Sequence, residues 1–170
     1  MDTREHQWEA WLQAAQTPEI ARELEAVYAI IADQVEATSP RCDASGRCCN
    51  FRAWEHRLYT TGLEAAYLVA RLAESEWAAG RRVLTREAIE AAVARGDCPL
   101  LIGTRCGAHA IKPSGCRIYF CDPAAQGWQG ELSERTLRMI RGLHERRGVP
   151  YRYGEWRELL AMFVDERPSL

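Results

Sequence analysis

Seven cysteines fall in two short irregular segments, and this grouping constrains the 170-residue chain more than any other feature. The segments cover residues 41–52 and 97–123, and both are rich in Gly, Pro, Asp and Ser. An odd number of cysteines cannot pair completely into disulfides. In a reducing compartment, clustered cysteines point to metal ligation or redox chemistry instead. We therefore expect a mainly α fold, a small helical domain whose two cysteine-bearing loops are joined at a metal site.

The rest of the chain has the periodicity of amphipathic helices. The predicted helices cover residues 18–37, 61–79, 85–96, 133–148 and 154–164, with a shorter one around Trp8 and Trp11. Thr17-Pro18 and Thr85 have the form of helix starts, and Thr61 with Glu64 has that of a capping box. In the third helix we expect Ile89 and Val93 to point inward. Ser133 is the expected cap of the fourth, with a staple between Leu132 and Leu137.

Length and composition indicate one domain over residues 1–170. A hydrophobic share of 47% and a charged share of 27% are typical of globular proteins. With 22 basic and 24 acidic side chains, nothing in the charge indicates binding to nucleic acid. No apolar run is long enough for a membrane span, and the first eight residues lack the pattern of a secretory signal. We therefore expect a cytoplasmic protein without a membrane partner.

The first cysteine group reads Cys42-Asp-Ala-Ser-Gly-Arg-Cys48-Cys49, in which Gly46 gives the backbone freedom that a tight turn needs. The second group begins with Cys98-Pro-Leu-Leu, which is followed by the isolated Cys106. It continues with the run Lys112-Pro-Ser-Gly-Cys116-Arg-Ile-Tyr119 and ends at Cys121. Free cysteines also occur as small buried apolar residues. Three within eight residues make that alternative the weaker one, and we favour metal ligation.

These motifs, in this order, resemble the YkgJ-type cysteine-cluster family, described as zinc- or iron-chelating proteins and related to flagellin lysine methylases with an iron–sulfur centre. The resemblance covers about residues 42–121. It implies that the metal ligands come from Cys42, Cys48, Cys49, Cys98, Cys106 and Cys116. The chain departs from the family pattern in lacking an extra Cys-x-x-Cys spacing and in having Lys112 where an arginine is usual. Cys121 has no counterpart in the family.

The spacing favours an iron–sulfur cluster over zinc. Structural zinc sites pair their ligands two to four residues apart, and no Cys-x-x-Cys occurs here. In extended backbone, adjacent side chains such as those of Cys48 and Cys49 point to opposite faces and would not share one ion. A multi-iron cluster accepts thiolates from widely spaced loops. His109, three residues after Cys106, is a candidate nitrogen ligand, although a surface or capping role suits it better.

We therefore expect four of the six family cysteines to hold one cluster, of the 4Fe-4S type, in a redox or accessory protein. Nearby cations would lower thiol pKa values and tune the potential, with Arg117 as the candidate. Two alternatives use the same residues. One is a zinc-stabilised structural or interaction protein, and the other is a metal-dependent enzyme related to protein lysine methylases. The sequence leaves the catalytic residues, the reaction and any redox or protein partner open.

Overall fold

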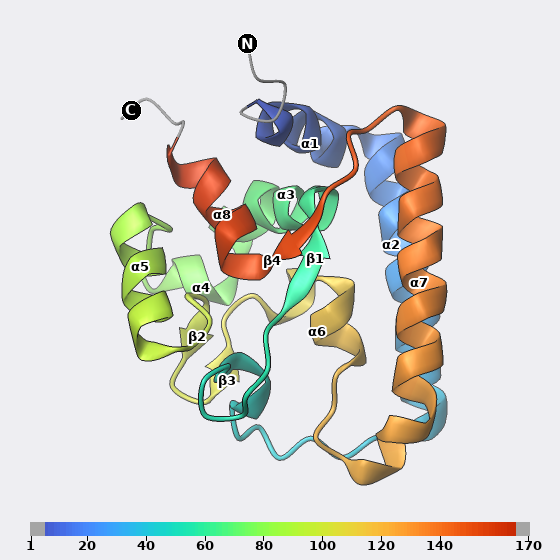
Figure 1. The fold of residues 1–170 in the computed structure, drawn as a ribbon, viewed down its shortest axis with the longest axis vertical. Helices are drawn as coiled ribbons and strands as arrows, with labels where there is room; N and C mark the ends of the chain where they lie inside the picture. Colours follow the sequence, from blue (N-terminus) through green and yellow to red (C-terminus); the bar gives the residue numbers. More distant parts are fainter. Residues whose placement is uncertain (1–5, 166–170) are drawn as a thin grey trace.

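The computed structural model describes residues 6–165 and confirms the mainly helical fold (Figure 1). Met1–Glu5, part of the segment used to predict the absence of a signal, lies outside the described residues. The α-helices are α1 Gln7–Gln16, α2 Pro18–Thr38, α3 Gly62–Arg71, α4 Glu76–Ala79, α5 Arg86–Arg95, α6 Ser114–Ile118, α7 Gln126–Arg147 and α8 Trp156–Asp165. Residues 6–165 also contain four 3₁₀ turns: η1 Arg47–Cys49, η2 Leu72–Glu74, η3 His109–Ile111 and η4 Pro123–Ala125.

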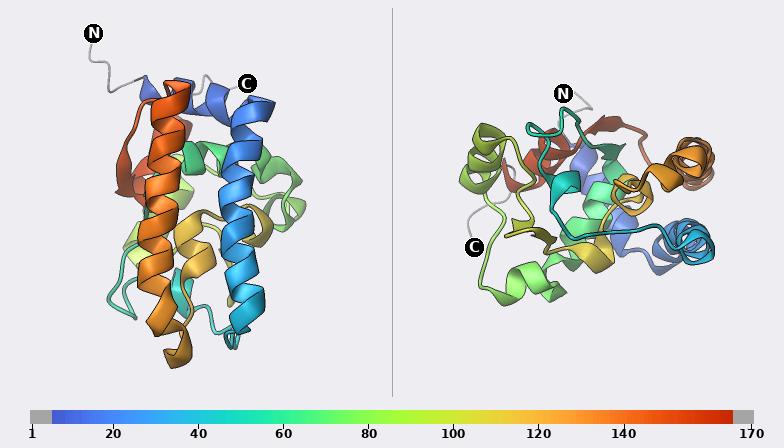
Figure 2. Two further views of the ribbon diagram at one scale, coloured as in Figure 1. Left: turned by 90° about the vertical axis from the view of Figure 1, so that its right-hand side faces the viewer. Right: turned by 90° about the horizontal axis from the view of Figure 1, so that it is seen from below.

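Helices α2 and α7 lie side by side along one edge of the molecule, with α6 against both (Figure 2). The arginines at the end of α7, Arg146 and Arg147, form ion pairs with Glu23 on α2. Because these side chains are largely at the surface, their pairing contributes only modestly to stability.

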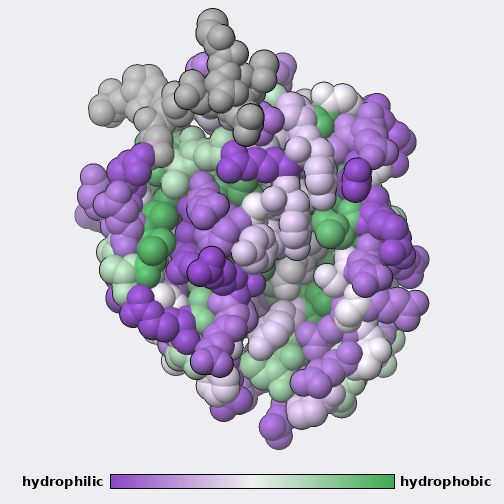
Figure 3. All heavy atoms as spheres, viewed as in Figure 1, coloured by the Kyte–Doolittle hydropathy of each residue, from purple (hydrophilic) through white to green (hydrophobic). Residues whose placement is uncertain are grey.

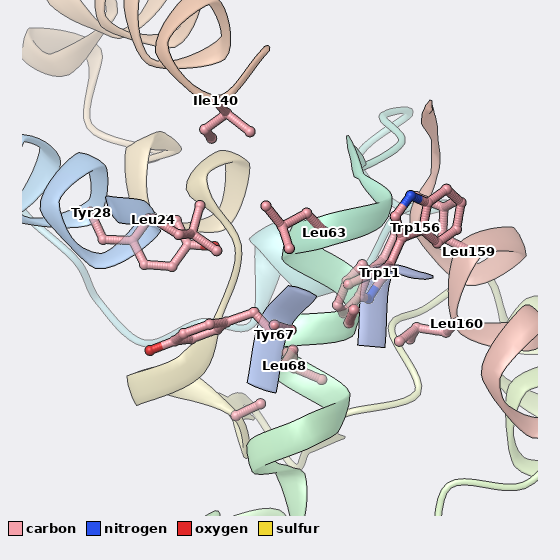
Figure 4. Close-up of a cluster of buried hydrophobic side chains, with 14 of the residues drawn as sticks. Trp11, Leu24, Tyr28, Leu63, Tyr67, Leu68, Ile140, Trp156, Leu159 and Leu160 are labelled. Atoms are coloured by element: carbon pink, nitrogen blue, oxygen red, sulfur yellow. The ribbon is translucent and has the colours of Figure 1, made fainter. Parts of the chain in front are cut away.

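Helix α3 is at the centre of the hydrophobic core, where Leu63, Tyr67 and Leu68 separate two groups of side chains (Figure 4). Side chains from α2 and α7 lie on one side, and those from α1 and α8 lie on the other. Trp11 packs so closely on Gly62 that an added Cβ there would lie 2.3 Å from the indole ring. The first residue of α3 therefore has to be glycine for α1 to approach it.

Two short antiparallel sheets complete the fold. Strands β1 (Tyr59–Thr61) and β4 (Tyr153–Glu155) pair with Tyr59 opposite Glu155. Strands β2 (Leu101–Ile102) and β3 (Arg105–Cys106) form a hairpin with Leu101 opposite Cys106. The helical periodicity of the sequence contains no sign of these strands, which are two or three residues long.

Three details of the predicted helices are wrong. The helix predicted over 61–79 is interrupted by η2 and resumes as α4, which lets the Trp77 N–H donate to the Gly107 carbonyl (3.1 Å). In α5, Ala92 rather than Val93 is buried beside Ile89; Val93 is 47% exposed. Helix α7 begins at Gln126, so Ser133 lies inside it and caps nothing.

The face in Figure 3 carries hydrophilic side chains over α5 and α7, with smaller hydrophobic areas between them. None of the helices in residues 6–165 has the length and apolarity needed to cross a bilayer.

The predicted capping box is present at the start of α3, and its glutamate does more than cap a helix. The Glu64 carboxylate is 1% exposed and accepts hydrogen bonds from the side chains of Thr60 (2.8 Å) and Thr61 (3.0 Å) and from the Thr61 N–H. It also accepts the Ser114 N–H (2.8 Å) and a longer contact from the Tyr28 hydroxyl (3.4 Å). One buried carboxylate thus links α2, β1, α3 and the start of α6.

We expect Glu64→Ala to lower the free energy of unfolding by about 3–5 kcal/mol, because it leaves several buried donors without an acceptor. Urea denaturation followed by circular dichroism measures this loss. Glu131→Ala, at an exposed position on α7, is the matched control and should change stability by less than about 0.5 kcal/mol. Equal stabilities of the two variants would contradict the role given to Glu64.

Candidate metal centre

Backbone hydrogen bonds hold the two cysteine-bearing segments together. The Cys98 N–H donates to the Cys49 carbonyl, and the Arg52 N–H donates to the Gly96 carbonyl, both at 2.8 Å. Gly46, with φ of 75°, lies against the Thr104 backbone in the hairpin turn, so a side chain there would be both strained and crowded. The expected tight turn at Gly46 is therefore present, and it packs on the second segment.

The second segment presents its cysteines from three different elements. Cys98 lies two residues after Gly96, the αL residue that ends α5, Cys106 lies in β3, and Cys116 lies in α6. The Gly107 N–H closes the hairpin on the Leu100 carbonyl (2.9 Å). In this turn the Ala108 N–H donates to the Cys106 sulfur, a backbone N–H···S contact of the kind that stabilises a thiolate.

Five thiols influence one another's pKa where these segments join, and we call them the five-thiol group. They are those of Cys48, Cys49, Cys98, Cys106 and Cys116. Cys49 is at the centre, because its thiol interacts by hydrogen bonds with the sulfurs of Cys106, Cys48 and Cys98. Cys49 and Cys98 are buried, Cys106 and Cys116 are partly buried, and Cys48 is exposed.

The vicinal pair differs from the expectation based on extended backbone. Cys48 and Cys49 lie in the 3₁₀ turn η1, and their side chains interact with each other instead of pointing to opposite faces. The geometric objection to both cysteines serving one site therefore does not hold in this fold.

The pKa values of the thiols in the five-thiol group differ. The hydrogen bond from Cys49, helped by the Lys112 charge, lowers the pKa of Cys48 to about 6. A hydrogen bond from Cys49 and the Ala108 N–H likewise lower the pKa of Cys106 to about 7. Donation to these sulfurs raises the pKa of Cys49, and burial raises that of Cys116. Thiolate character is thus concentrated on Cys48 and Cys106.

Lys112 is the cation that acts on this group. Its charge favours the thiolates of Cys48, Cys106 and Cys116. Arg117, which we had expected to tune the site, instead donates to the carbonyls of Lys112 (2.7 Å) and Ala110 (2.9 Å) and lies over the Tyr28 ring. Arg117 therefore holds the Lys112 loop in place.

Two residues beside the thiols gave no signal in the sequence. The Trp156 indole N–H donates to the Cys98 sulfur (3.4 Å) from α8, and His56 Nε2 lies 3.3 Å from the Cys48 carbonyl. His56 also stacks on Tyr119. Trp156 is far from the cysteines in sequence and reaches them through the packing of α8, whereas His56 follows Cys49 by seven residues and is placed by the fold of the 50–58 loop.

The other candidate residues lie outside the five-thiol group. Cys42 is exposed, and so is Cys121, whose pKa is raised first by burial and then by the Cys48 thiol. The Arg41 N–H donates to the Asp122 carboxylate (2.8 Å), which joins the two chain segments that carry these thiols. His109 is exposed, and its Nε2 is 3.0 Å from the Lys112 amine, whose charge lowers the His109 pKa. All seven cysteines are free thiols.

Within residues 6–165, no set of three or more His, Cys, Asp or Glu side chains is arranged to hold a single metal ion. The donor chemistry of the five-thiol group nevertheless suits a soft metal. It offers sulfur ligands, two of them with thiolate character, together with N–H groups directed at two sulfurs.

No protein-family model, curated protein or solved structure matches this chain. The resemblance to the YkgJ-type family therefore stays a prediction from the cysteine motifs. So does the ligand role of Cys42, whose thiol is exposed.

In metal-free protein we expect Cys48 to be alkylated by iodoacetamide at neutral pH and to lose reactivity below about pH 6, because the thiolate is the nucleophile. Cys121 is the matched control, since it is also exposed but burial raises its pKa. Its labelling should increase only in alkaline solution. Peptide mass spectrometry over a pH series measures both rates, and identical pH profiles would contradict the proton sharing described above.

Proposed function

We propose that this chain is a metal-binding protein whose five-thiol group holds an iron–sulfur cluster. The observation that supports this best is that hydrogen bonding with the thiols of Cys106, Cys48 and Cys98 raises the pKa of Cys49. Burial of thiols contributed by separate loops is expected of a ligand set, because thiolates from several loops are what such clusters use.

The residues around the thiols have roles consistent with this proposal. Cys48 and Cys106 favour the thiolate form that a metal requires, while Cys49 and Cys116 would have to lose protons on binding. Metal affinity should therefore increase with pH. The Lys112 charge and the N–H groups of Ala108 and Trp156 would offset the negative charge of the ligands. A bound cluster would supply electron transfer.

Zinc is the second candidate. The side chains of Cys48 and Cys49 interact within the single turn η1. Both thiolates could therefore bind the same ion, as a tetrahedral zinc site requires. The presence of five thiols, one more than such an ion uses, and the absence of Cys-x-x-Cys favour the iron–sulfur cluster.

Anaerobically purified protein should be brown, contain iron and acid-labile sulfide, and bleach under dithionite. Cys49→Ser and Cys106→Ser should lose most of the metal, because each removes a thiol from the centre of the group. Iron, sulfide and zinc analysis measures this. Colourless protein with one zinc per chain would show that the site binds zinc and holds no cluster. Protein with neither metal would contradict the proposal.

Cys121→Ser is the matched control and should keep its metal content. Cys42→Ser separates the ligand set implied by the family resemblance from the one that the thiol contacts favour. We expect it to keep most of its metal, because Cys42 is exposed and lies outside the five-thiol group.

Lys112→Gln should lower the reduction potential, because loss of a nearby cation disfavours the more negative reduced cluster. Arg105→Gln is the control, since Arg105 is exposed on β3 and should leave the potential unchanged. Redox titration followed by visible absorption distinguishes the two variants. Equal potentials would mean that Lys112 does not tune the site.

A further inference from the structure

A pocket of about 320 Å³ opens beside the five-thiol group. Its lining residues come from η1, the following loop, the α6–η4 connection and the start of α7: Arg47, Trp54, Tyr119, Phe120, Cys121, Gln126 and Gln129. This volume is at the lower end of ligand pockets, which run from about 300 to 1,000 Å³. It suits a molecule about the size of one amino acid.

Arg47 gives the pocket a positive charge, which also acts on the Asp43 carboxylate and contributes to the lowering of its pKa. Its guanidinium carbon lies 4.4 Å from the centroid of the Trp54 ring, a contact that uses the face of the guanidinium and leaves its N–H edge available. In the described part of the chain, Arg47 is in no ion pair. A guanidinium in this orientation can donate two parallel N–H groups to the two oxygens of a carboxylate.

The other polar groups of the pocket are largely occupied. The Gln129 amide accepts the Phe120 N–H (3.0 Å) and donates to the Phe120 carbonyl (3.3 Å). The Tyr119 hydroxyl is hydrogen-bonded to the Cys121 sulfur, and its ring is stacked on His56 with centroids 5.4 Å apart. The walls therefore offer flat aromatic surface next to the positive charge of Arg47.

We propose that this pocket binds a small carboxylic acid with a flat apolar body, whose carboxylate pairs with Arg47 and whose body lies against the aromatic side chains. The inference extends the proposed function, because Arg47 directly precedes Cys48, the exposed member of the five-thiol group. A bound acid would lie next to the metal centre, as a substrate or an effector must.

Isothermal titration calorimetry of the full chain with benzoate tests the pocket. We expect binding with a Kd on the order of 1 mM and a loss of about tenfold or more in Arg47→Gln, because a charge-assisted pair is removed. Arg105→Gln is the matched control, since Arg105 likewise directly precedes a cysteine of the group, and it should bind as the wild type does. Absence of benzoate binding, or equal loss in both variants, would overturn the proposal.

Two further ligands test its specificity. Benzyl alcohol, which lacks the carboxylate, should bind more weakly than benzoate. Inorganic phosphate, which lacks the flat body, should also bind more weakly. Phosphate binding as tight as that of benzoate would indicate a general anion site and overturn the ligand class.

Metal content, measured on every sample, separates this inference from the proposed function. Wild-type protein that contains no metal but binds benzoate through Arg47 would contradict the metal centre and support the pocket. If Arg47→Gln loses metal together with benzoate, Trp54→Ala decides the matter. This variant removes an exposed wall residue and the support of Arg47, and unchanged benzoate affinity in it would overturn the pocket.

Discussion

The buried carboxylate of Glu64 is the interaction on which the arrangement of the helices depends. It accepts hydrogen bonds from Thr60 and Thr61 at the start of α3 and from the backbone of Ser114 at the start of α6. A buried carboxylate is tolerated only when its oxygens are satisfied, so these elements have to meet at one point. Because Cys116 comes two residues after Ser114, the same contact fixes where that thiol enters the five-thiol group.

A second constraint is the backbone pairing of residues 49–52 with residues 96–98. It joins the two cysteine-bearing segments without help from a metal, since these hydrogen bonds involve only main-chain groups. The thiols are therefore brought together by the fold, and their protons are shared among Cys48, Cys49 and Cys106. The affinity of the proposed metal for these thiols would depend on the removal of their protons.

The helices could be predicted well where local signals act alone. The Thr85 cap, the αL glycine at 96 and the Thr61–Glu64 capping box are all present, because each depends on residues three or four apart. The interruption before α4 could not be predicted, since the hydrogen bond that accompanies it joins the Trp77 N–H to the Gly107 carbonyl, thirty residues away along the chain. The early start of α7 at Gln126 was missed as well, because the capping signal at Ser133 was a local coincidence within a longer helix.

For the candidate site, the sequence by itself determined the chemistry, namely thiols in two groups, glycine at the tight turn and a basic residue before Pro113. Tertiary structure alone decided which thiols meet. It groups four other thiols with that of Cys49 and leaves the thiols of Cys42 and Cys121 exposed. It also directs Arg117 to backbone carbonyls and Lys112 to the thiols, and it brings in Trp156 from α8. The physical reason is that residue type fixes what a side chain can bind, whereas its neighbours depend on contacts between segments far apart in the chain.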